Sequence, residues 1–271
     1  MHSAIEEKRW FPFGFGPVLA DHRVFCLPFA GGGASFFLSW RKALPMIALV
    51  PVQYPGRETR LGEPCQQNLD QLVDELAHAL LPHLDRPYSL LGYSLGAKVG
   101  FALCHRLASL GAPQPASFIP VAYGAPNRKS TITNAANLPD AEFCDLIRRY
   151  GGMPETVFQD AELLKMLLPI LRSDIGLSQQ SVATSPLRCP IFAYAGVDDA
   201  AADPSSVDRW RRFTEAGFAL RTFAGGHFFA RTADDFLPTL ARDVGTGAGR
   251  SACPQSDSLC VAASTNLEVV L

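Results

Sequence analysis

The sequence predicts an α/β fold in which a mainly parallel central sheet is flanked by helices. Short runs rich in β-branched and aromatic residues alternate with longer segments of helical periodicity. One of these runs passes directly into a helical segment through a G-x-S-x-G turn at residues 92–96. The 271 residues suffice for a single α/β domain with a substantial core, which we place at residues 1–244.

The expected strands are short and separated by longer segments. Between the second and the third, leucines recur at helical spacing with Asp74 and Glu75 on the opposite face, which predicts a crossover helix. The six expected strands cover residues 23–27, 49–54, 89–92, 118–123, 191–195 and 219–223.

An insertion at about residues 130–185 interrupts the alternation, because it holds two helical patterns rather than one. The first pattern begins after Leu138-Pro139-Asp140 and stops at Gly151-Gly152. The second is rich in leucine and contains Pro169, which should kink it. The two patterns are either ordinary core helices or an apolar lid over a functional site. After the sixth strand and a further segment, residues 245–271 are small, polar and aperiodic, which predicts a disordered tail.

Composition excludes several classes of protein. A net charge of -2 gives no basic field for nucleic acid, and no apolar run approaches the roughly 20 residues that span a bilayer. The first residues, MHSAIEEKRW, carry acids where a signal peptide needs a positive segment, so we expect a cytoplasmic protein. The seven cysteines show no CxxC or Cys/His spacing, which predicts neither a disulfide framework nor a metal site; most are interpreted as small buried hydrophobes.

Ser94 is the candidate nucleophile. Gly92 and Gly96 supply the small residues that a nucleophile elbow requires, and such a turn projects the serine Oγ above the sheet. Helical periodicity resumes at Val99, so the N–H of Leu95 should lie at a helix N-terminus, where partial positive charge favours a developing anion. These features predict the α/β-hydrolase fold.

A serine hydroxyl needs a positioned base, and on this fold the order along the chain is serine, acid, histidine. The turn after the fifth expected strand offers Asp198, Asp199 and Asp203. Asp199 is preferred, because alternation along a tight turn should aim one of the adjacent pair inward. After the sixth strand, two glycines free the backbone to deliver the imidazole of His227 towards Ser94. We therefore predict a catalytic triad of Ser94, Asp199 and His227.

An oxyanion hole needs two backbone donors, one of which should be the N–H of Leu95. The glycine-rich loop after the first expected strand, residues 27–33, supplies the other, which we assign to Ala30. A phosphate-binding loop is the alternative for this segment, but the GxxxxGK[ST] pattern is absent.

Four blocks of this sequence resemble the type II thioesterases that accompany modular polyketide and nonribosomal peptide synthases. The resemblance covers roughly residues 23–244, and its first two blocks separate this family from lipases and generic esterases better than G-x-S-x-G does. It supports Asp199, since Gly196, Asp199 and Trp210 match a family pattern, whereas Tyr93 stands where the family usually has histidine. The blocks are FCLPFAGGGASFFLSW (25–40), QYPGRETR (53–60), LLGYSLGAKVGF (90–101) and FAGGHFF (223–229).

The resemblance implies hydrolysis of acyl groups from the phosphopantetheine arm of a carrier protein, which clears stalled or misprimed units. It also implies that the insertion is a mobile lid. No cofactor or metal is expected. A chain-terminating medium-chain fatty acyl carrier-protein thioesterase would use the same triad. A general lipase and a non-catalytic acyl-binding module that keeps only the fold complete the set of competing interpretations.

Acyl or peptidyl carrier protein domains of a synthase are the expected partners, and we expect a monomer. Carrier proteins are generally acidic, so basic side chains near the predicted site could help them dock. The candidates for this role are Arg57, Arg60, Arg128 and Lys129.

Overall fold

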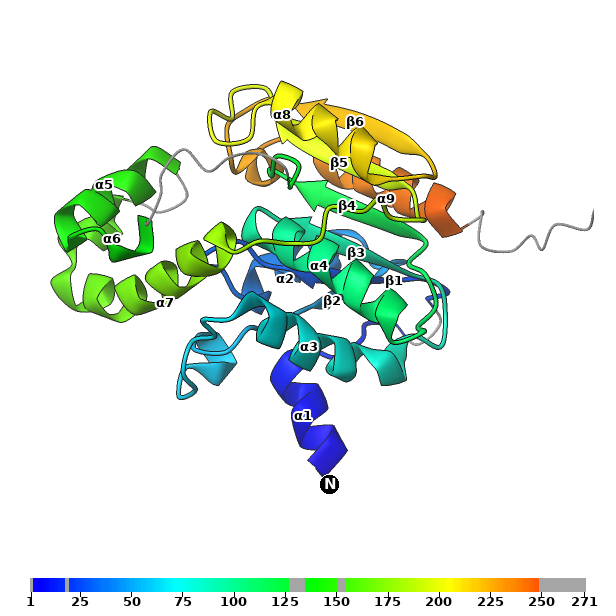
Figure 1. The fold of residues 1–271 in the computed structure, drawn as a ribbon, viewed down its shortest axis with the longest axis horizontal. Coiled ribbons are helices and arrows are strands. Elements are labelled where there is room, and N and C mark those ends of the chain that lie inside the picture. The colour runs from blue at the N-terminus through cyan, green and yellow to red at the C-terminus, as the bar shows by residue number, and fades with distance from the viewer. Residues whose placement is uncertain (1, 18–19, 127–134, 151–154, 249–271) are drawn as a thin grey trace, which may run out of the picture.

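A computed structural model describes residues 2–17, 20–126, 135–150 and 155–248 of the chain. Six strands form one sheet in the order β2-β1-β3-β4-β5-β6, and every paired neighbour is parallel (Figure 1). The predicted strands and the parallel sheet are confirmed, with bounds that shift by at most three residues. The strands are β1 (Arg23–Leu27), β2 (Ala48–Pro51), β3 (Tyr88–Tyr93), β4 (Ser117–Val121), β5 (Ile191–Gly196) and β6 (Phe218–Phe223).

The strand order places a topological switch between β1 and β3. From β1 the chain moves outward to β2 and then returns to the other side of β1, where β3 begins a run towards β6. The loops that follow β1 and β3 therefore leave the sheet in opposite directions. The crevice between such loops, at the carboxyl ends of the strands, is where open α/β sheets bind their ligands.

Helices cover both faces of the sheet. In Figure 1, α3 (Leu69–Leu80) and α4 (Leu95–Ser109) lie in front of the strands, and α9 (Phe236–Ala248) lies behind them with α2 (Leu38–Ala43). Along β3, Leu90 packs in the core cluster of the α3 and α4 face, whereas Leu91 packs with residues of α2 and α9. This alternation buries both faces of a parallel sheet. The leucine spacing therefore predicted the crossover helix α3 correctly.

The N- and C-terminal segments were less predictable. Helix α1 (His2–Trp10) has no counterpart in the sequence-based prediction, and its Trp10 reaches the core. Helix α9 continues to Ala248, four residues beyond the expected domain end at Val244. The predicted disorder of the remaining tail falls on residues 249–271, which lie outside the described residues.

The insertion contains three α-helices in its described part: α5 (Asp140–Tyr150), α6 (Glu155–Gln159) and α7 (Ala161–Gln179). Figure 1 shows them, in green, beside the main body. Two helices were expected, and α6 was missed because five residues are too few to show a period. Helix α7 runs through Pro169 without ending, and the kink there stays a prediction. The rest of the insertion, residues 127–134 and 151–154, is outside the described part.

None of the helices in the described ranges combines the length and the apolar character that crossing a membrane requires.

Candidate active site

Ser94 occupies a strained turn between β3 and α4. Its φ is +51°, a value that costs free energy for a residue with a side chain, and its N–H donates to Val121 O at 2.8 Å. A Cβ added to Gly92 would lie 2.2 Å from Gly96 O, and one added to Gly96 would lie 2.1 Å from Leu27 O. Only glycine fits these two positions, as the elbow motif predicts.

The structure brings Ser94, His227 and Asp199 together from three separate strand ends. The Nε2 of His227 lies 3.0 Å from Ser94 Oγ, and its Nδ1 lies 2.9 Å from Asp199 Oδ2. Asp199 is 3% exposed, and its Oδ1 accepts hydrogen bonds from the N–H groups of Ala201 and Ala202. Because the ionised carboxylate is an acceptor, the Nδ1 of His227 carries the proton, which leaves Nε2 free to accept the serine proton.

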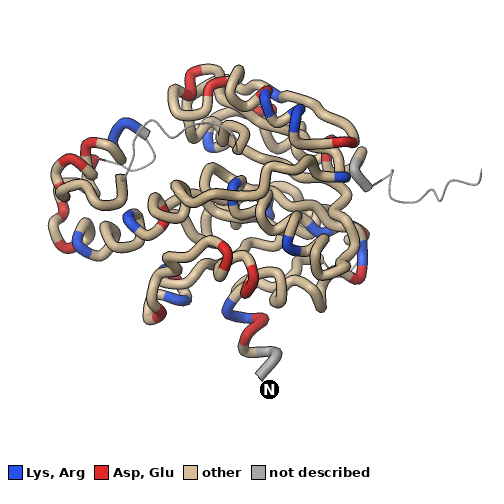
Figure 2. The backbone as a smooth tube through the Cα atoms, in the orientation of Figure 1, with Lys and Arg blue, Asp and Glu red and all other residues tan. Residues whose placement is uncertain are grey.

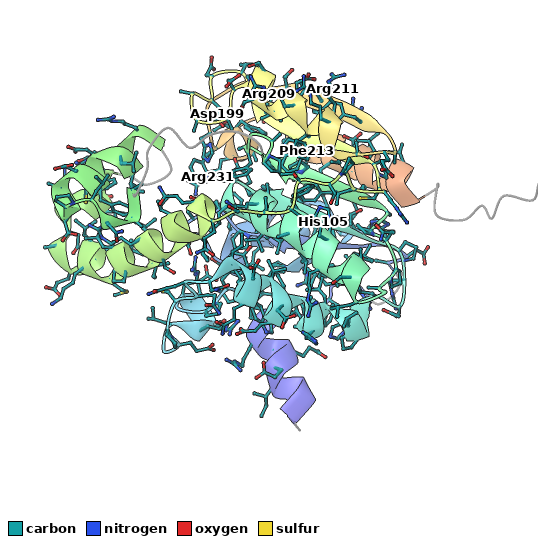
Figure 3. All side chains as sticks on the ribbon, viewed as in Figure 1. His105, Asp199, Arg209, Arg211, Phe213 and Arg231 are labelled. Atoms are coloured by element: carbon teal, nitrogen blue, oxygen red, sulfur yellow. The ribbon has the colours of Figure 1, made fainter. Side chains whose placement is uncertain are left out.

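The two other aspartates of the same turn have different positions. Asp198 is exposed. Asp203 caps the short helix α8 (Pro204–Asp208), because its Oδ1 accepts from the N–H groups of Ser205 and Ser206. Figure 3 labels Asp199 on the part of the body that faces the insertion helices. Asp199 is therefore the aspartate of this turn that contacts His227.

Tyr93 holds the backbone of the histidine. Its hydroxyl donates to His227 O at 2.7 Å, and its ring stacks on Phe228 with centroids 5.7 Å apart. Burial raises the pKa of Tyr93, so the hydroxyl stays a donor. The sequence marked this position only as a departure from the family. Its contact with His227 could not be found from sequence, because the two residues are 134 positions apart.

The loop after β1 forms a tight turn beside the serine. Gly32 N–H donates to Phe29 O at 2.9 Å, and Gly31 has a φ of +77°, the signature of a type II turn. Ala30 is the residue between Phe29 and Gly31, and Leu95 directly follows the serine. Both line the same pocket as Ser94. Neither the N–H of Ala30 nor that of Leu95 has an acceptor among the described residues. Both donors are available for an oxyanion.

A cavity of about 900 Å³ lies above Ser94 and His227. Its size matches pockets for small organic groups. The insertion helices supply part of its apolar wall through Leu146 and Ile147 of α5 and Leu171 of α7. The predicted association of the insertion with the site is therefore present, and opening of the wall as a lid remains a proposal.

The QYPGRETR block supports the segment that follows the loop after β1, and most of its residues are buried. Gln53 Oε1 accepts from Ala34 N–H at 3.0 Å, and Glu58 accepts from Ser35 N–H at 3.1 Å, so both side chains brace the segment after the β1 loop. Arg57 contacts Asp174 of α7 through both terminal nitrogens. The sequence identified this block by resemblance and could not assign these contacts.

The proposed docking role of Arg57 and Arg60 is wrong. Arg57 is 4% and Arg60 3% exposed, so neither can meet a partner protein. Arg60 is paired with Glu63 and lies 4.4 Å from the ring of Trp10. Both arginines were placed at the surface because their acidic partners were unknown. The other two candidates, Arg128 and Lys129, are outside the described residues.

A second serine–histidine contact lies in the interior of the sheet. His22 Nε2 is 2.9 Å from Ser89 Oγ, which is also 2.7 Å from Ser117 Oγ. Ser89 is fully buried, and burial lowers the pKa of His22 to about 4. The hydroxyl of Ser89 has no access to substrate, and His22 contacts no acid among the described residues, so we interpret the pair as structural. Ser94 is the serine that meets a cavity.

The described cysteines carry free thiols, and four of the five are buried, as the interpretation of small buried hydrophobes requires. Cys253 and Cys260 lie outside the described residues. Within the described ranges, no three His, Cys, Asp or Glu side chains gather as a group that could hold a metal ion.

A parallel sheet with a strained serine elbow, a histidine and a buried aspartate at its carboxyl edge defines an α/β-hydrolase with a serine nucleophile. The chain belongs to the thioesterase family, whose domain model matches residues 22–246. It is therefore a serine hydrolase that acts on thioesters.

Three proteins show what this chain is similar to. The gramicidin S biosynthesis protein GrsT of Aneurinibacillus migulanus is 35% identical over 225 residues, which cover 82% of this chain and 88% of GrsT. The structure of the type II thioesterase BorB from the borrelidin biosynthetic cluster is 34% identical, with a TM-score of 0.76 over 87% of this chain and 96% of BorB. The human medium-chain S-acyl fatty acid synthase thioesterase is 28% identical over 221 residues, which cover 78% of this chain and 81% of the human protein.

Proposed function

We propose that this protein is an editing thioesterase, which hydrolyses acyl groups from the phosphopantetheine arm of carrier proteins of a polyketide or nonribosomal peptide synthase. The observation that carries the proposal is the 3.0 Å contact between Ser94 Oγ and His227 Nε2, at a cavity partly walled by the insertion. The similarity to GrsT and BorB supports the class of substrate.

In the proposed mechanism, Ser94 Oγ attacks the thioester carbonyl while His227 Nε2 takes its proton. Asp199 keeps the imidazole oriented and stabilises the imidazolium. The N–H groups of Ala30 and Leu95 bind the oxyanion of the tetrahedral intermediate. The C–S bond then breaks, and His227 returns the proton to the arm's thiolate. Water, deprotonated by the same imidazole, releases the acid from the acyl-serine.

The insertion helices are proposed to act as the lid, with the apolar residues of α5 and α7 receiving the acyl chain. A chain-terminating medium-chain thioesterase is less supported, because the human medium-chain relative is less similar than GrsT. A non-catalytic acyl-binding module would have no need of the strained Ser94 or of its aligned base.

The test is to measure acyl release from acyl-phosphopantetheinyl carrier proteins across chain lengths, with native protein and with Ser94→Ala. Release should disappear in Ser94→Ala. A broad preference for short acyl groups supports editing, whereas one sharp maximum at medium length supports chain termination. No release by native protein from any carrier protein contradicts both.

We further propose that catalysis needs no metal or cofactor, and that the enzyme acts in the cytoplasm as a monomer. Dialysis against a chelator should leave the rate unchanged. Light scattering during gel filtration should give the mass of one chain, 29.3 kDa. A mass of two chains, or a rate restored only by added metal, contradicts the respective statement.

A further inference from the structure

Two arginines at the rim of the active-site cavity have no acidic partner among the described residues. Arg231, in the short helix η6 (Phe229–Arg231), and Arg149, in α5, are both exposed and both line the cavity. Figure 3 labels Arg231 on the side of the body that faces the insertion, and Figure 2 shows basic residues at the end of α5. Other arginines in the described ranges do form ion pairs with acidic side chains. These are Arg9, Arg23, Arg57, Arg60, Arg86, Arg106, Arg148, Arg172, Arg211 and Arg221.

Arg231 is held in position by aromatic rings. Its guanidinium carbon lies 4.9 Å from the ring centroid of Phe228 and 5.4 Å from that of Phe36. Phe228 follows the catalytic histidine, with its ring centroid 5.1 Å from that of His227. Stacking engages the flat face of a guanidinium and leaves its N–H edges free to donate. The positive charge is thus oriented beside the catalytic base without being neutralised.

The described lining of the cavity holds more basic than acidic side chains. Its only acidic lining residue among those described, Glu58, already accepts hydrogen bonds from Ser35. Lys98, the third basic lining residue, is buried and donates to the carbonyls of Ser178 and Gln180 at the end of α7. Among the charged lining residues that the structure describes, the two rim arginines therefore remain to meet an anion on a bound substrate.

We propose that Arg231 and Arg149 form an anion subsite for the phosphate of the phosphopantetheine arm. This inference rests on the proposed function. The phosphate lies at the opposite end of the arm from the thioester, so it belongs at the exposed rim when the carbonyl is at Ser94. An arginine fork matches phosphate oxygens in geometry and charge. The acyl chain instead meets the apolar wall that the insertion provides.

The experiment compares acetyl-pantetheine with acetyl-4′-phosphopantetheine, which differ only in the phosphate. Native protein should prefer the phosphorylated arm by about tenfold in kcat/KM, chiefly through KM, because an exposed charge-assisted contact acts on binding. Arg231→Gln and Arg149→Gln should each reduce that ratio, and the double variant should bring it close to one. Raising the salt concentration should reduce the native ratio as well.

Arg148→Gln is the matched control. Arg148 adjoins Arg149 on α5 but pairs with Asp145 and Glu155 and is absent from the cavity lining, so its removal should leave the ratio at the native value. Arg231→Lys keeps the charge and should retain more of the preference than Arg231→Gln. An equal ratio in the native protein and the double variant overturns the subsite.

Two further measurements separate the possible failures. If the double variant instead changes the preference for malonyl- over acetyl-pantetheine, the arginines bind an acyl carboxylate, and the phosphate assignment is wrong. Calorimetric titration with 4′-phosphopantetheine and pantetheine tests the subsite without turnover. If native protein hydrolyses neither thioester, the proposed function fails. Tighter binding of the phosphorylated arm, lost in the double variant, would still support the subsite, and equal binding would overturn it.

Discussion

Asp174 of α7 and Arg57 of the loop after β2 form a buried ion pair that joins the insertion to the loop after β1. Arg57 Nη2 lies 2.8 Å from Asp174 Oδ1, and the two side chains are 5% and 0% exposed. Asp174 Oδ2 also accepts the N–H of Gly31 at 2.7 Å. The peptide that follows Ala30 is therefore oriented by a carboxylate on the insertion. This group therefore couples the position of α7 to the geometry of the proposed oxyanion hole.

Removing the charge of Asp174 should affect both stability and turnover. Asp174→Asn leaves the guanidinium of Arg57 buried without its counter-charge, which should lower the free energy of unfolding by about 3 kcal/mol. The turn at Gly31 loses its strong acceptor, so kcat should fall more than KM rises. Urea unfolding and steady-state kinetics measure the two effects.

A double replacement separates positioning from stability. Arg57→Met with Asp174→Leu removes both buried charges and should recover much of the stability lost in Asp174→Asn. Its kcat should stay low, because Gly31 N–H still lacks an acceptor. A double variant with native kcat would show that the pair only stabilises the fold. The exposed Asp145→Asn is the control and should change neither quantity.

The neighbouring aspartates allow a matched test of the catalytic acid. Asp199→Asn should lower kcat by roughly 10⁴-fold, because an amide at this position favours the wrong histidine tautomer. Asp198→Asn alters an exposed carboxylate one residue away and should retain native kcat. Single-turnover release of acyl groups measures both variants. Equal losses in the two would contradict the assignment of Asp199.

Tyr93→Phe tests the support of His227. The variant removes the hydrogen bond to His227 O but keeps the ring stack on Phe228. The free energy of unfolding should therefore fall by about 1 kcal/mol. Looser placement of the imidazole should lower kcat severalfold with little change in KM. Thermal unfolding, and kcat and KM determined separately, are the readouts. An unchanged kcat with lowered stability would mean that Tyr93 supports the fold alone.

His22 predicts a specific dependence of stability on pH. Burial lowers its pKa from 6.5 to about 4, so between these values the unfolded chain binds a proton that the folded chain does not. The free energy of unfolding should therefore fall as the pH drops from about 6.5 to 4, and the contribution of His22 is fully present above pH 6.5.

The check is the difference between native protein and His22→Gln, measured by urea unfolding across this pH range. The native curve should fall more steeply on the acid side. Parallel curves would show that His22 is not held neutral by the fold. Because His22 is outside the cavity, this variant should still turn over substrate at pH 8.

Local signals predicted which side chains the structure brings together at the site. The elbow at Ser94 follows from two glycines around one serine, a pattern within five residues, although the close approach that requires Gly96 is to Leu27 O at the end of β1. His227 follows a strand and two glycines, which is also local information. Asp199 was selected from three candidates by alternation along one turn, and the structure places it against His227.

The sequence by itself determined the strands, the order of the serine, the acid and the histidine, and the insertion, because these depend on residue spacing and turn chemistry within short segments. Only the tertiary structure decided that Arg57 is buried, that Tyr93 holds His227, and that Arg231 remains unpaired at a cavity rim. The first two depend on partners that are distant in the sequence: Arg57 and Asp174, for example, are 117 residues apart. The third depends on the lack of an acidic partner for Arg231 among the described residues. Burying a guanidinium costs free energy unless a counter-charge and hydrogen bonds compensate, so the burial of Arg57 could not be assigned before Asp174 was located.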